Sequence, residues 1–178
     1  MLKGLLINVI ILLFIVTGVY MTKLQAQEIK LEGKKIEYTL PYAGILPDHP
    51  LYPLKAGRDQ VLQFLTRDNY KKAQLYLLLS DKRLSMSRDL AKKGKWQLAI
   101  STLSKGEKYM SYIPNNIMLM KKQGSPAPQE FILTSRLSSE KHQEIIEDLI
   151  QDVPQSERMH LEEAMKLNAQ TRAKLNSF

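Results

Sequence analysis

The sequence has 178 residues, of which 44% are hydrophobic and 25% are charged, as in an ordinary globular protein. It contains no cysteine, which excludes thiol catalysis, cysteine zinc sites, disulfide bonds and a lipid on an N-terminal cysteine. The formal net charge is +8. Residues 28–128 carry 18 basic and 9 acidic residues, whereas residues 129–178 carry 6 and 9. The first part is therefore basic and the second mildly acidic.

The first 26 residues are typical of a secretory signal or a membrane anchor. Lys3 precedes an apolar run from Leu5 to Met21, and Ala26 follows as a small residue at which a signal could be cleaved. The run is short for a bilayer span. We expect residues 1–26 to be a signal peptide cleaved after Ala26 or, alternatively, an uncleaved anchor. Because Lys3 would stay in the cytoplasm, the rest of the chain is expected to be extracytoplasmic under either outcome.

A polar linker and a proline-rich segment follow. Residues 27–37 are polar without a clear period, which favours a linker. We expect one helical domain at residues 38–178, opened by an extended segment at residues 38–53. The prolines of that segment bias each preceding residue towards extended backbone, so no helix is expected before Leu51. Its apolar residues predict that it packs along the helical body. The alternative is a docking strip for a partner.

Apolar residues at helical spacing predict five helices after that segment. Their expected ranges are 51–65, 69–93, 95–113, 129–152 and 155–175. Asp68 is the expected N-cap of the second helix. Pro114 predicts a break or kink after the third helix, followed by a short helical turn at residues 117–123.

Each of these helices has an apolar stripe that we expect to be buried. In the first helix it consists of Leu54, Val61, Leu62 and Leu65. In the fourth it consists of Leu133, Leu137, His142, Ile145, Ile146, Leu149, Ile150 and Val153. No strand pattern of any length occurs. The predicted class is all-α, an antiparallel bundle of about five helices, preceded by the extended segment and an N-terminal signal or anchor helix.

Three segments of the sequence resemble a known family. Residues 38–59, YTLPYAGILPDHPLYPLKAGRD, are similar to the signature Y-x-L-P-Y-P-G-I-L-P-D-H-P-L-Y-x-L-K-x-x-R-D, from which they depart at Ala43 and Gly57. The signature opens an uncharacterised family of bacterial extracytoplasmic helical domains, catalogued as a domain of unknown function. Residues 80–109 and 141–154 resemble later segments of that family. The resemblance implies export or membrane anchoring and a helical fold, and it implies no activity or catalytic residue.

Metal and cofactor sites have little support in the sequence. Glu157 and His160 form an E-x-x-H pair, but a di-iron bundle needs two such pairs, and no second one exists. We expect Asp48, beside His49 in a proline-bounded loop, to bond nearby backbone N–H groups. His142 lies on an apolar stripe and is expected to be a hydrogen-bonded core histidine. We therefore predict no metal and no cofactor.

Binding without catalysis is the predicted function. There is no G-x-S-x-G motif and no glycine-rich phosphate loop. We expect a non-enzymatic extracytoplasmic interaction or scaffold module, secreted or membrane-tethered, that binds an unknown protein or envelope component. An anionic membrane surface is the other partner considered, and nucleic acid is not expected. The expected binding residues are Tyr42, Asp48, His49, Tyr52, Arg58 and Asp59.

Two other functions are kept as alternatives. The first is an exported metal- or stress-sensing helical protein that uses Asp48, His49, Glu157 and His160. The second is a membrane-proximal enzyme, which a deep cleft holding His49, Arg58 and Asp59 together would favour.

Overall fold

The computed structural model describes residues 37–178, which belong to one compact unit. Within that range the helices are α2 (Tyr52–Leu65), α3 (Asn69–Lys92), α4 (Trp96–Lys122), α5 (Gln129–Asp152) and α6 (Arg158–Asn176), with a 3₁₀ turn at Gln155–Glu157. No strand occurs between residues 37 and 178, so the predicted all-helical class is confirmed. The predicted signal or anchor at residues 1–26, and all but the last residue of the linker, lie outside the described residues.

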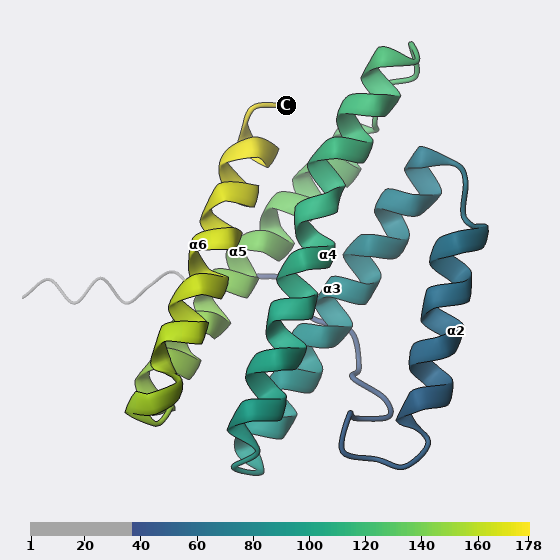
Figure 1. Cartoon of the computed structure of the whole chain (residues 1–178). Coiled ribbons are helices and arrows are strands. Elements are labelled where there is room, and N and C mark those ends of the chain that lie inside the picture. The colour runs from purple at the N-terminus through teal and green to yellow at the C-terminus, as the bar shows by residue number, and fades with distance from the viewer. Residues whose placement is uncertain (1–36) are drawn as a thin grey trace, which may run out of the picture. The chain divides into compact units, whose positions relative to one another are not determined.

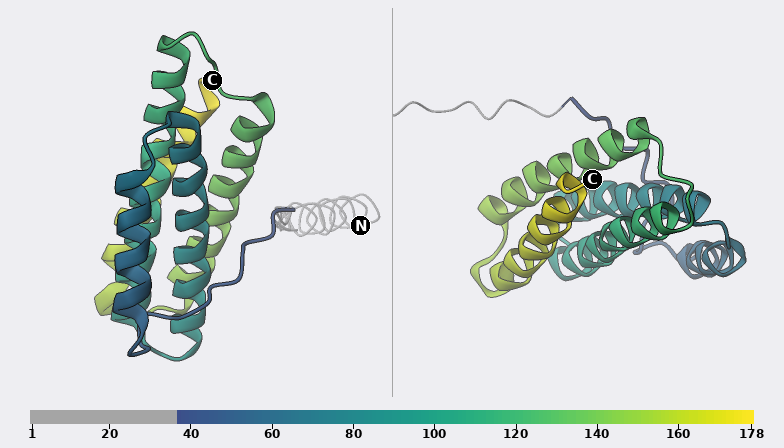
Figure 2. Two further views of the ribbon diagram at one scale, coloured as in Figure 1. Left: turned by 90° about the vertical axis from the view of Figure 1, so that its right-hand side faces the viewer. Right: turned by 90° about the horizontal axis from the view of Figure 1, so that it is seen from above.

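The helices stand side by side in three groups (Figure 1). α3 and α4 form a central hairpin, α5 and α6 lie along one side of it, and α2 stands at the opposite edge. The view from above shows the same order (Figure 2). None of the described helices is both long and apolar enough to cross a bilayer.

The ends of α3 follow from local sequence. At the start, the Asp68 carboxylate accepts a hydrogen bond from the Lys71 N–H at 2.8 Å, which confirms the predicted cap. At the end, Gly94 adopts a φ of +71°, and the Lys95 N–H reaches back to the Leu90 carbonyl at 3.0 Å. A glycine adopts this left-handed conformation without steric penalty, so the chain turns directly into α4.

The bundle has two apolar clusters, one at each end. The cluster near the α3–α4 turn includes Leu84, Leu90, Leu103, Ile145, Ile146 and Leu161. The cluster at the other end includes Leu77, Met110, Ile113, Phe131, Ile132 and Leu175. Between them α3, α4, α5 and α6 each place a buried polar residue, namely Asp81, Glu107, His142 and Asn168. The core is therefore a polar layer between two apolar layers.

Of the predicted break or kink at Pro114, the break is wrong, because α4 continues through the proline to Lys122. An interior proline costs a helix about 3 kcal/mol. The buried side chains of Ile113 and Ile117, on either side of Pro114, both pack in the cluster at that end. Since burying one such side chain contributes about 1.5–3 kcal/mol, burial outweighs the penalty. The Asn116 side chain also donates a hydrogen bond to the Tyr112 carbonyl, at 2.8 Å, within the turn around the proline.

The predicted buried face of α2 is also wrong. Leu54 is 73% exposed, Val61 55% and Leu65 65%, and Leu62 is exposed as well. The buried residue of this helix is Asp59, at 3% exposure. Leu133, assigned to the buried stripe of α5, is likewise exposed, and Ser135, Ser138 and Ser139 are buried instead. In both helices the side that faces the bundle is more polar than periodicity indicated.

We expect Gly106→Ala, in α4, to destabilise the protein by about 1–3 kcal/mol, because an added methyl overpacks the α3–α4 contact. The new Cβ would lie 3.0 Å from the Arg83 Cβ and 3.3 Å from the Ser80 carbonyl oxygen. Gly57→Ala in α2 is the matched control. Its Cβ would meet nothing within 4 Å, and alanine favours helix by up to about 1 kcal/mol. Urea denaturation measures both, and equal effects at the two positions would contradict close packing at Gly106.

Candidate functional site: a buried ionic cluster and an outward-facing helix

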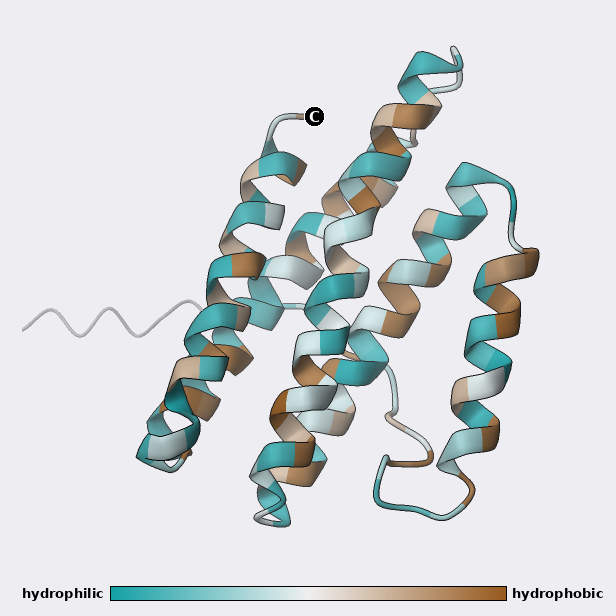
Figure 3. Ribbon diagram, in the orientation of Figure 1, coloured by the Kyte–Doolittle hydropathy of each residue, from teal (hydrophilic) through white to brown (hydrophobic). Residues whose placement is uncertain are grey.

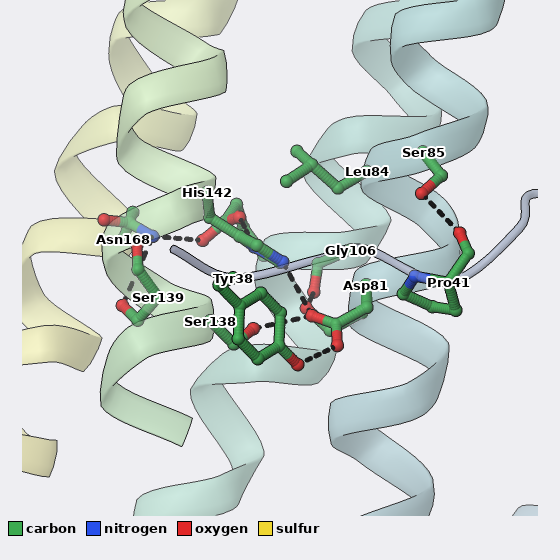
Figure 4. A network of polar contacts seen from close by, with 12 residues as sticks. Tyr38, Pro41, Asp81, Leu84, Ser85, Gly106, Ser138, Ser139, His142 and Asn168 are labelled. Carbon is green, nitrogen blue, oxygen red and sulfur yellow. Dashed lines mark hydrogen bonds and ion pairs between the residues drawn. The ribbon is translucent and has the colours of Figure 1, made fainter. Parts of the chain in front are cut away.

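Three ionisable side chains meet in the middle of the bundle. The His142 imidazole of α5 lies between two carboxylates, with Nδ1 2.6 Å from Glu107 Oε1 and Nε2 3.0 Å from Asp81 Oδ1. Asp81 belongs to α3 and Glu107 to α4. Figure 4 shows the imidazole pointing from α5 towards Asp81. We call these three residues the ionic cluster.

The carboxylate oxygens of the ionic cluster have further donors. Ser138 Oγ donates to Asp81 Oδ1 at 2.6 Å, and the Tyr38 hydroxyl donates to Asp81 Oδ2 at 2.6 Å (Figure 4). Asn168 Nδ2, on α6, donates to Glu107 Oε2 at 3.2 Å. Each of the four carboxylate oxygens therefore accepts at least one hydrogen bond. Complete pairing is what makes a buried charged group tolerable.

Electrostatics favour the protonated form of His142. Burial by itself would lower the pKa of the imidazole, but the charges of Glu107 and Asp81 and the hydrogen bonds to them raise that pKa to about 9. The imidazolium then donates from both nitrogens. At neutral pH the cluster therefore holds one positive charge between two carboxylates. For Tyr38, burial and then the charge of Asp81 raise the pKa of the phenol well above its usual range.

The imidazole of the ionic cluster is enclosed. His142 and Glu107 are fully buried, and both imidazole nitrogens are committed to carboxylates, so neither is free to ligate a metal or take a proton from a substrate. A groove of about 630 Å³ reaches its edge at Tyr38 and Asp81. The prediction of a hydrogen-bonded core histidine is confirmed, although its partners are charged. The spacing of residues along α5 did not indicate that the partners of His142 would be carboxylates.

The two histidines named under the alternative of a metal sensor make other contacts. His160 is exposed, and its nearest acidic partner is Glu163, with 3.7 Å between Nδ1 and Oε2. His49 Nδ1 accepts a hydrogen bond from the Leu51 N–H at 3.1 Å, at the start of α2. Among residues 37–178 no three His, Cys, Asp or Glu side chains are arranged to hold a metal ion.

A second charged contact joins α2 to α3. Asp59 is buried, and its Oδ1 lies 2.8 Å from the Arg58 guanidinium. Its Oδ2 lies 3.8 Å from Arg83, a buried arginine of α3 whose guanidinium carbon is 5.5 Å from the centre of the Tyr52 ring. Gln63 adds a bond from Nε2 to the Tyr109 hydroxyl of α4 at 3.2 Å. α2 is therefore held to the bundle by its polar side, which explains why its leucines face outwards.

The six predicted binding residues fall into three places. Tyr42 and Arg58 line an open groove of about 480 Å³ together with Leu51, Leu54, Lys55 and Lys82. Tyr52 and Asp59 belong to the contact with Arg83. Asp48 pairs with Lys95 at 2.8 Å and Lys93 at 3.2 Å, so the expectation that it bonds backbone N–H groups is wrong. His49 makes the backbone contact instead.

The signal that would have found the ionic cluster is a charged residue inside an apolar stripe. Glu107 follows Ile100 and Leu103 and precedes Met110, at the spacing of one helix face. Asp81 lies in the same way between Leu77 and Leu84. A charge at such a position in an apolar stripe predicts a buried ionic contact.

Comparisons with known proteins identify a family and no function. The sequence model of the family described as "Domain of unknown function (DUF5667)" matches residues 44–176. The chain belongs to this family, as its resemblance to a domain of unknown function predicted. No curated protein matches the chain. No solved structure matches it either.

We expect the free energy of unfolding to fall as pH rises from 6.5 to about 9. The native state binds the His142 proton more tightly than the unfolded state, so this contribution is complete below pH 6.5 and is lost as pH passes about 9. The shift corresponds to about 3 kcal/mol. The carboxylates that face His142 are those of Asp81 and Glu107. The titration of Tyr38 changes the stability only above pH 10.0, the ordinary pKa of its phenol.

Urea denaturation across that pH range measures the effect. In Glu107→Gln, which keeps the shape of the side chain and removes its charge, the pKa of His142 in the native state falls, so the loss should be smaller and should end at lower pH. A stability that is flat or rising over the range in the parent protein would contradict a protonated His142.

Tyr38→Phe should destabilise the protein by about 1.5–3 kcal/mol, because it removes a hydrogen bond to the buried Asp81 carboxylate. Tyr42→Phe is the matched control, since Tyr42 is 86% exposed and should tolerate loss of its hydroxyl. Thermal or urea unfolding compares the two. Equal stability of both variants would mean that residue 38 does not anchor the segment.

Proposed function

We propose that this member of the DUF5667 family is a non-enzymatic extracytoplasmic interaction module, secreted or tethered by its N-terminal segment, that binds a partner through α2. The observation that carries the proposal is the orientation of α2. Its polar side contacts the bundle, while Leu54, Val61 and Leu65 face away from it. Exposed apolar residues gathered on one helix face are typical of an interaction surface. We call Leu51, Leu54, Val61, Leu62, Phe64 and Leu65 the α2 surface.

The contacts of the proline-rich segment support a fixed position for the α2 surface. Ser85 Oγ, on α3, donates to the Pro41 carbonyl at 2.7 Å, and the Tyr38 hydroxyl bonds Asp81. From α2, Lys55 Nζ donates to the carbonyls of Ala43 at 2.8 Å and Ile45 at 3.0 Å. The segment is thereby bonded both to α3 and to α2. We infer that it braces α2, so that little conformational freedom is lost on binding.

The buried ionic cluster supports binding rather than turnover. General acid–base catalysis needs a titratable group within hydrogen-bond reach of a substrate atom. Both ring nitrogens of the buried His142 are occupied by carboxylates, so they are not within reach of a substrate atom. The alternative of a metal sensor receives no support from the positions of His49 and His160, which have no shared partner among the described contacts.

Cysteine accessibility in cells tests the proposal. Because the chain has no cysteine, Leu54→Cys places a single thiol on the α2 surface, and Ala169→Cys places one at an exposed position of α6 as the matched control. In cells that produce the protein, a membrane-impermeant maleimide should label Ala169→Cys readily. Leu54→Cys should react several-fold more slowly. In the purified, detergent-extracted protein the two rates should become similar.

Two results would count against the proposal. Equal labelling of both positions in cells would mean that nothing covers the α2 surface. An Ala169→Cys thiol that becomes reactive only after cell lysis would place the domain inside the cytoplasm and overturn the proposed export.

A further inference from the structure

We propose that the partner of the α2 surface is the headgroup region of an anionic lipid bilayer. This inference rests on the proposed function and names the kind of partner that the same surface fits. The bundle would lie with α2 in the plane of the interface, its leucines entering the lipid and its basic residues at the level of the phosphates. Such a docking is the behaviour of interfacial amphipathic helices, whose apolar side is flanked by Lys and Arg.

The apolar residues are of the types that favour the interface. Leu54 and Val61 are seven residues apart and so lie on one side of α2, with the largely exposed Phe64 on the same outward side. Tyr42 stands largely exposed at the open groove beside Leu54. Aromatic rings with one apolar and one polar end concentrate at the level of lipid headgroups. Figure 3 shows hydrophobic stretches along α2, which stands at one edge of the bundle.

The exposed charges around the α2 surface are mainly positive. The exposed charged residue of α2 is Arg58, and Arg67 and Lys71 follow at the α2–α3 corner. The acid of α2, Asp59, is buried against Arg83. Asp68 is the exposed acid at that corner, and its carboxylate accepts the Lys71 N–H at the cap of α3. A surface with apolar residues at its centre and cations at its rim is complementary to anionic lipid headgroups.

The burial of acids increases this asymmetry. Asp59, Asp81 and Glu107 are all enclosed, so the outer surface of α2, α3 and α4 is more basic than their sequence. The opposite side of the bundle, formed by α5 and α6 (Figure 1), carries exposed acids, among them Glu147, Asp148, Glu162 and Glu163. An anionic surface would attract the α2 edge and repel the α5–α6 side. The charge distribution therefore selects one orientation of the bundle.

The groove between the proline-rich segment and α2 provides a place for a headgroup. It has a volume of about 480 Å³ and is lined by Tyr42, Leu51, Leu54, Arg58 and Lys82, with no acidic residue in its wall. Gly44, at a φ of +71°, turns the chain along the rim of this groove. A lipid phosphate beside Arg58 and Lys82 would leave its acyl chains next to the leucines.

An environment-sensitive fluorophore on a single cysteine tests the inference in the full chain. The dye is attached to Leu54→Cys or Val61→Cys, and to Ala169→Cys on α6 as control, and the protein is mixed with lipid vesicles. In vesicles containing phosphatidylglycerol, the two α2 dyes should shift to the blue and be quenched by headgroup spin labels. Vesicles of phosphatidylcholine alone should give a several-fold smaller response, and the control dye should respond to neither.

Charge variants show whether the response depends on the basic residues beside α2 or on the net charge of the whole protein. Arg67→Gln with Lys71→Gln should weaken the response of the Val61→Cys dye several-fold. Lys166→Gln with Lys174→Gln, two exposed lysines on α6, removes the same charge from the opposite side and should leave the response unchanged. Salt at about 1 M, where the Debye length is about 3 Å, should weaken the response of the parent surface.

The outcomes distinguish this inference from the proposed function. If the α2 dyes stay in water in anionic vesicles, the lipid partner is wrong. The proposed function still stands in that case if Leu54→Cys is protected from maleimide in cells. If the dyes shift to the blue without vesicles as protein concentration rises, the occupant is a second copy of the chain and the lipid inference is overturned.

Discussion

The structure depends on the pairing of one imidazolium with two carboxylates in the middle of the helical bundle. Removing such charges from water costs several kcal/mol per ion, and only close pairing and further hydrogen bonds offset that cost. His142 bonds both Asp81 and Glu107, and Ser138, Tyr38 and Asn168 supply the remaining donors. Each of the four helices α3 to α6, and the proline-rich segment as well, therefore contributes a side chain to one hydrogen-bonded network.

The position of this network between two apolar clusters has a structural consequence. Leucine and isoleucine layers tolerate sliding of one helix past another, because one apolar side chain can replace its neighbour with modest loss. A layer with Asp81, Glu107 and His142 tolerates no such sliding, because a shift by one turn would leave buried charges without partners. We infer that the ionic cluster sets the register of α3, α4 and α5. The Tyr38 hydroxyl extends that register to the segment before α2.

Polar contacts also set the orientation of α2, whose polar side faces the bundle. Asp59 and Gln63 face the bundle, where Arg83 and Tyr109 bind them, and the leucines are left outside. An arrangement with the leucines inwards would expose more polar surface and leave Arg83 buried without a carboxylate. Internal electrostatics thus produce an external apolar surface, and the burial of acids leaves a basic rim around it.

Much of the fold could be predicted from sequence, and the site could not. The bounds of α5, the cap at Asp68 and the turn at Gly94 follow from local signals, because each depends on residues within one helical turn. The orientation of α2 depends on Arg83, which lies in another helix, and periodicity alone assigned its leucines to the core. The ionic cluster joins residues up to 61 positions apart, a pairing that spacing within a helix cannot indicate. Of the predicted binding residues, Tyr42 and Arg58 line a common groove, while Asp48, His49, Tyr52 and Asp59 have structural contacts.

The protonation state of His142 tests the central claim most directly, and ¹⁵N NMR of the histidine side chains in the intact protein measures it. At pH 8, below the pKa of about 9, both His142 ring nitrogens should carry a proton. Their ¹⁵N resonances should then have the nearly equal positions of an imidazolium. A neutral ring at that pH, with one nitrogen unprotonated, would contradict the account, because the two carboxylates would then lack the positive charge that holds them together.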